Sequence, residues 1–83
     1  MINKVKKYLK NIAKNHTLTE TKQIIKKIVT HPDLTEIEQW LIYYTYAEKR
    51  MVANTSAKLG LSEAQFYIVQ KMALLKLYYI YLL

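Results

Sequence analysis

The chain contains no cysteine, one glycine, one proline and only six acidic residues among its 83 positions. Without cysteine, disulfides and zinc–thiolate sites are excluded, and the sequence is compatible with a reducing compartment. Glycine and proline are too rare for a turn-rich β protein, and strand-like alternation of apolar and polar residues is hard to find. The sequence therefore predicts an all-α fold.

Apolar residues are plentiful, at 52% of the chain, which is enough for one core in one domain of 83 residues. The longest apolar stretch, residues 72–83, is interrupted by Lys76 and is shorter than the ~20 residues of a membrane span. The basic N-terminal segment lacks the continuous apolar run and the cleavage site of a secretory signal. We therefore expect one cytoplasmic domain over residues 1–83 that does not span a membrane.

The net charge of +7 is concentrated in the N-terminal part of the chain. Residues 1–33 hold eight lysines against two acids, a balance of +6, whereas residues 34–83 hold five basic residues against four acids. Such a basic chain is expected to bind phosphates, anionic lipid or an acidic protein.

Start and stop signals divide the chain into about five helices. The first covers residues 2–14, with lysines around an apolar stripe. Three capping boxes open later helices, because a hydroxyl residue is followed three positions on by Glu or Gln. The boxes are Thr17 with Glu20, Thr35 with Glu38, and Ser62 with Gln65. A short helix over residues 51–59 stops at Gly60, and Pro32 ends the second helix.

Apolar spacing predicts which faces are buried. In the third helix we expect the inner face to consist of Ile37, Trp40, Leu41 and Tyr44. The fifth helix carries two apolar stripes, of which a domain of this size can bury one. The first stripe is Phe66, Val69, Ala73, Leu77 and Ile80, and the second is Ile68, Met72, Leu75, Tyr79 and Leu82. The second stripe requires a partner, a second copy of the chain, or an N-terminal helix packed back on it.

The residues around Gly60 fit the corner of a helix-turn-helix. Such a corner has a small residue four positions before the glycine, apolar residues beside it, and two buried residues in the second helix. These positions are filled by Ser56, Leu59, Leu61, Phe66 and Val69. Ser62 caps the second helix, so its first turn is expected to project outward.

A longer match extends over residues 34–77, a little over half of the chain. Its motifs are LTEIE at 34–38, YYTY at 43–46, LGLS at 59–62 and ALLKL at 73–77. In these motifs the segment resembles the helix-turn-helix of sigma-factor region four and of phage late-transcription regulators of the autolysin-regulator type. The resemblance implies a regulator of transcription, encoded by a phage or mobile element, that binds double-stranded DNA.

Two sets of DNA-contacting residues follow from this resemblance. Amide, carboxylate and apolar side chains can read base edges in the major groove. The expected base-reading residues are Glu63, Ala64, Gln65, Tyr67, Ile68 and Lys71. Because only one of them is cationic, the phosphate contacts are expected from lysines elsewhere and from the residues before Gly60. These are Lys4, Lys6, Lys7, Lys10, Lys49, Arg50 and Lys58.

The sequence is also compatible with other functions. One is a non-enzymatic helical bundle that binds a protein partner, as an anti-activator or a bacteriocin-immunity-like protein would, through its tyrosines and C-terminal helix. The second apolar stripe also suits a homodimer, and the basic first helix suits a peripheral membrane protein. No nucleophile–base pair or phosphate loop appears, and His16 and His31 are isolated. We therefore expect no enzymatic activity, metal or cofactor.

Overall fold

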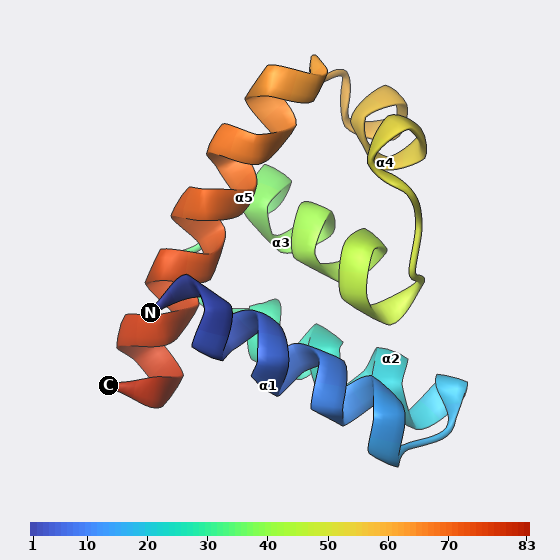
Figure 1. Ribbon diagram of the computed structural model, residues 1–83, viewed down its shortest axis with the longest axis vertical. Coiled ribbons are helices and arrows are strands. Elements are labelled where there is room, and N and C mark those ends of the chain that lie inside the picture. The colour runs from blue at the N-terminus through green and yellow to red at the C-terminus, as the bar shows by residue number, and fades with distance from the viewer.

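Helical segments follow one another along the whole chain, and no strand interrupts them (Figure 1). The computed structural model describes all residues 1–83. In chain order the segments are α1 (Ile2–Asn15), α2 (Leu18–Val29), α3 (Glu36–Ile42), the π-helical turn η1 (Tyr43–Ala47), α4 (Val52–Leu59), α5 (Glu63–Leu77) and the π-helical turn η2 (Tyr78–Leu82). The all-α prediction is confirmed. The π-helical turns, which continue α3 and α5, were not part of it. None of these helices has both the length and the apolar character that a membrane span requires.

Helix α5 runs along one edge of the molecule, and helices α1, α3 and α4 pack against its inner side (Figure 1). Helix α3 occupies the middle of the bundle and contacts α5, α4 and, through η1, α2. Helix α1 crosses the C-terminal half of α5, with α2 beside it, whereas α4 lies at the far end next to the start of α5. The N-terminal half of α5 is therefore not covered by α1.

The three expected capping boxes all form. The backbone N–H groups of Thr17, Thr35 and Ser62 each donate to the side chain three residues later, at 2.9, 2.7 and 2.8 Å. Each cap oxygen in turn accepts from the backbone N–H of that later residue. Because both bonds satisfy amides that have no partner inside the helix, the sequence alone locates these helix starts.

Gly60 ends α4 in the left-handed conformation, with φ of 68°. The backbone N–H of Leu61 then donates to the carbonyl oxygen of Ser56 at 2.9 Å, which closes the turn. A residue with a Cβ is strained at this φ, so the single glycine lies where the backbone requires it.

The core is built from the apolar faces of α1, α2, α3 and α5. Helix α1 contributes Val5, Leu9 and Ile12, as its periodicity predicts. Phe66, Ala73 and Leu77 from the first stripe of α5 are also buried. Leu74, between the expected stripes, is fully buried as well.

The expected inner face of α3 is wrong at two positions. Trp40 and Ile37 are 42% and 44% exposed, while Glu38, Leu41 and Ile42 are buried. Trp40 stacks on Tyr44 instead, with the ring centroids 5.3 Å apart. Tyr44 is itself only half-buried, and Tyr46 is the tyrosine that enters the core.

The reason for this shift is an ion pair between α3 and α5. The ammonium of Lys76 donates to the carboxylate of Glu38 at 2.8 Å, and the backbone N–H of Thr35 donates to the same oxygen. Burial by itself would raise the pKa of Glu38, but these hydrogen bonds lower it below its ordinary value. Turning Glu38 inward rotates α3 so that Ile37 and Trp40 face outward.

Candidate nucleic-acid interface

Three helices meet at the α4–Gly60–α5 corner, since α3 contacts both α4 and α5. Ser56 and Phe66 are buried in this corner, and Leu59, Leu61 and Val69 are half-buried. The positions that the sequence assigned to the inside of the corner are therefore all at least partly covered by protein.

The expected base-reading residues all lie on the open side of α5. Each of the six is exposed, and none is covered by another helix. Tyr67 is 51% exposed and contacts Phe66 edge to face, at 5.4 Å between ring centroids. One face of the first turns of α5 is therefore open to solvent.

The side chain of Gln65 also takes part in the capping box of α5, which limits its ability to contact a base. Its side-chain oxygen accepts from the backbone N–H of Ser62 at 2.8 Å, as part of the capping box. A bidentate contact to adenine requires both the oxygen and the amide nitrogen of a glutamine. With the oxygen bound to Ser62, only the amide nitrogen of Gln65 is free to contact a base.

An apolar stripe continues along the exposed side of α5 and η2. Ile68, Met72 and Tyr79 are 61%, 52% and 55% exposed, and Leu75 and Leu82 are half-buried. This is the second stripe of the sequence analysis. Its members Ile68, Met72 and Tyr79 are left open, whereas Leu82, at the C-terminal end of the stripe, packs against α1 together with Leu77. Ile68 belongs both to this stripe and to the expected base-reading set.

Two of the expected phosphate-binding cations, Arg50 and Lys58, flank Tyr44. The Arg50 guanidinium lies 5.3 Å and the Lys58 ammonium 5.2 Å from the centre of the Tyr44 ring. Arg50 also donates to Glu48 at 2.5 Å and to Asn54 at 2.8 Å. The charge of Arg50 is thus compensated within the protein, whereas Lys58 has no acidic partner.

Lysines from α1 and from the segment after η1 surround one surface hollow of about 590 Å³. We refer to it as the basic hollow. Its charged lining is Lys6, Lys10, Lys14 and Lys49, and its remaining walls are Ala13, Thr45 and Tyr46. No acidic residue lines it, and none of the three ion pairs of the protein involves these lysines. Four positive charges are therefore held together without a counter-charge.

Lys49 adopts an unusual backbone conformation, with φ of 53°, the only positive φ outside glycine. This left-handed conformation costs a residue with a side chain roughly 1–2 kcal/mol. It allows the chain to leave η1 and reach α4, and it brings Lys49 next to two hollows. The second hollow, of about 880 Å³, also contains Lys22 and Arg50.

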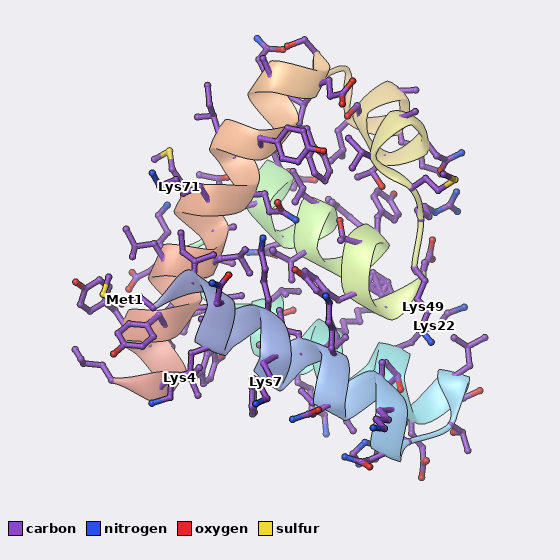
Figure 2. All side chains as sticks on the ribbon, viewed as in Figure 1. Met1, Lys4, Lys7, Lys22, Lys49 and Lys71 are labelled. Atoms are coloured by element: carbon purple, nitrogen blue, oxygen red, sulfur yellow. The ribbon has the colours of Figure 1, made fainter.

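The other cations of α1 lie elsewhere. Lys4 and Lys7 project from the lower edge of the molecule in Figure 2, and neither lines the basic hollow. Lys71 projects from the opposite side of the molecule to Lys49 and Lys22 (Figure 2). Of the expected phosphate-binding residues, Lys6, Lys10 and Lys49 therefore share the basic hollow, whereas Lys4 and Lys7 lie outside it.

Sequence reasoning missed Lys14, Lys22 and Tyr46 as companions of the expected cations. A signal for one of them was present, because Lys6, Lys10 and Lys14 recur at every fourth residue and so share one helix face. The position of Lys49 opposite that face depends on how η1 packs on α1 and has no local signal.

No protein-family model, curated protein or solved structure matches this chain. The resemblance to sigma-factor region four therefore stays a prediction that rests on the motifs in residues 34–77.

Proposed function

We propose that the protein is a cytoplasmic DNA-binding regulator of transcription, of helix-turn-helix type and encoded by a phage or mobile element. The observation that carries the proposal is the α4–Gly60–α5 corner, where a capped helix presents one face of its first two turns to solvent. A helix of this kind fits the major groove of B-DNA. The surplus of basic residues supports the proposal, because phosphate neutralisation supplies much of the affinity of such proteins.

The direct test is equilibrium binding to a fluorescent random-sequence duplex at several salt concentrations. If about six phosphates are contacted, affinity should fall by about 10³-fold or more between about 50 and about 200 mM salt. Absence of binding at the lowest salt concentration would contradict the proposal.

Base reading by α5 is tested on a preferred duplex selected from a random pool. Because only the amide nitrogen of Gln65 is free, we expect Gln65→Ala to weaken binding to that duplex by about 1 kcal/mol, as for one hydrogen bond, and to leave random-duplex binding nearly unchanged. The matched control is Ser62→Ala, which breaks the same capping box but removes no candidate base contact. Equal losses in the two variants would mean that Gln65 acts only as a cap.

The exposed stripe of α5 favours a second candidate function, which is binding of a protein. Ile68, Met72 and Tyr79 form an apolar surface of the kind that marks protein interfaces. A second copy of the chain is the partner consistent with a DNA regulator, because dimers read two half-sites. Sedimentation equilibrium should then show a dimer that Met72→Glu dissociates. A monomer at all concentrations would contradict the homodimer and favour a different protein as the partner of the stripe.

A further inference from the structure

The basic hollow combines features that call for an anionic ligand. Lys6, Lys10 and Lys14 form a row along α1 that spans about 12 Å, at 1.5 Å rise per residue. Lys49 lies on the other wall. Like charges gathered in a hollow repel one another, and the field they create there attracts anions more strongly than isolated surface lysines do.

The chemistry of the lining suits phosphate groups. All four cations are lysines, which bind phosphate as compact point charges, and four of them together match the multiple negative charge of a phosphate or a row of phosphates. Tyr46 adds a phenol whose hydroxyl makes no hydrogen bond within the protein. Burial raises the pKa of Tyr46, so this hydroxyl stays protonated and can donate a hydrogen bond.

Lys49 supports the same conclusion through its backbone. Its φ of 53° is a conformation that glycine adopts without strain, yet the chain has a lysine there. Strained backbone that positions a charged side chain at the rim of a hollow is typical of a functional site.

We propose that the basic hollow is a binding site for phosphate groups. If the protein binds DNA as proposed above, the ligand is the duplex backbone, held apart from the groove contact of α5. A row of lysines about 12 Å long can neutralise successive phosphates of a strand, whose nucleotides rise by about 3.4 Å each. The site assigns the phosphate contacts to Lys6, Lys10, Lys14 and Lys49, and not to Lys4 and Lys7.

The test compares two double variants of the same helix with the same change of charge. Lys6→Gln with Lys10→Gln removes two lysines of the basic hollow, and Lys4→Gln with Lys7→Gln removes two lysines outside it. Both pairs are probed with inorganic tripolyphosphate and with a random duplex.

We expect the first pair to weaken tripolyphosphate binding about tenfold, as for the loss of a charge-assisted hydrogen bond. It should also lower the salt slope for the duplex by about 0.9 for each phosphate that the variant no longer neutralises. The control pair should change both quantities much less.

Lys49→Gly provides a second variant that separates binding from folding. Glycine relieves the strained backbone, so thermal stability should be unchanged or higher, while binding of both probes weakens. A variant that binds both probes like the unmodified protein would overturn the role of Lys49.

The outcomes distinguish this site from the proposed function. Tripolyphosphate binding that depends on Lys6 and Lys10, without any binding of duplex, would support the phosphate site and overturn the DNA-binding proposal. Equal losses from both lysine pairs would overturn the site and leave DNA binding in place. Absence of binding to either probe would overturn both.

Discussion

Helices α1 and α5 are both rich in apolar residues, but they differ in what surrounds those residues. The single apolar stripe of α1 is buried, and its five lysines lie around it without an acidic partner. Helix α5 has two apolar stripes, of which one is buried and one is exposed, and its Lys76 is paired with Glu38. The difference shows that this domain of 83 residues covers the one apolar face of α1 but only one of the two apolar faces of α5, and leaves the other exposed.

The largest expected change in stability is the difference between substitutions on the buried face and on the exposed face of α5. Phe66 is 1% exposed and Ile68 is 61% exposed, although they are two residues apart. Phe66→Ala should therefore lower the free energy of unfolding by about 3–5 kcal/mol, and Ile68→Ala by less than about 0.5 kcal/mol. Urea unfolding of the two variants measures both values. A similar, large cost for Ile68→Ala at every protein concentration would show that the second stripe is buried within the chain.

An intermediate loss of stability is expected when Lys76, which pairs with Glu38, is replaced, compared with a lysine of α1 that has no acidic partner. Lys76→Met leaves the carboxylate of Glu38 buried without its ion pair, which should cost about 2 kcal/mol. This is less than for a fully buried pair, because the Lys76 side chain is 34% exposed and water screens its charge. The matched change Lys7→Met in α1 removes an exposed lysine with no acidic partner and should cost less than about 0.5 kcal/mol. Thermal unfolding of the two variants provides the comparison.

The pH dependence of the Lys76→Met effect tests its cause. The pKa of Glu38 is lower in the folded protein than its ordinary value, so the pair stabilises the fold fully above the unfolded-state pKa of about 4.3. That stability is lost as the pH falls through the lower folded-state pKa. The difference between the unmodified protein and Lys76→Met should therefore shrink in acid. A difference that stays constant down to pH about 2 would exclude the ion pair as its cause.

The smallest expected effect concerns how the two helices begin. Helix α5 starts with a complete capping box at Ser62, whereas α1 starts at Met1 with no side-chain cap. Ser62→Ala should cost about 1 kcal/mol and speed the hydrogen exchange of the Gln65 amide, which donates to the Ser62 hydroxyl at 3.1 Å. Slow exchange of the Gln65 amide in this variant would mean that packing at the corner, and not the cap, protects it.

Much of this architecture was readable from the sequence because it depends on neighbours three or four residues apart. The starts of α2, α3 and α5 follow from hydroxyl residues paired with Glu or Gln, and the end of α4 follows from Gly60. The apolar period of α1 located its buried face correctly. The exposure of the six expected base-reading residues also follows locally, since Phe66 and the cap at Ser62 orient the first turns of α5.

The tertiary structure decided which of two chemically reasonable faces points inward and which distant charges meet. Nothing near Trp40 indicates that Glu38 turns into the core, because its partner Lys76 is 38 residues away. The meeting of Lys49 with the lysine row of α1, and the absence of a cover over Ile68 and Met72, likewise depend on how whole helices pack. Local hydrogen bonds fix where a helix begins and ends, but its rotation and its neighbours are set by contacts between segments far apart in the chain.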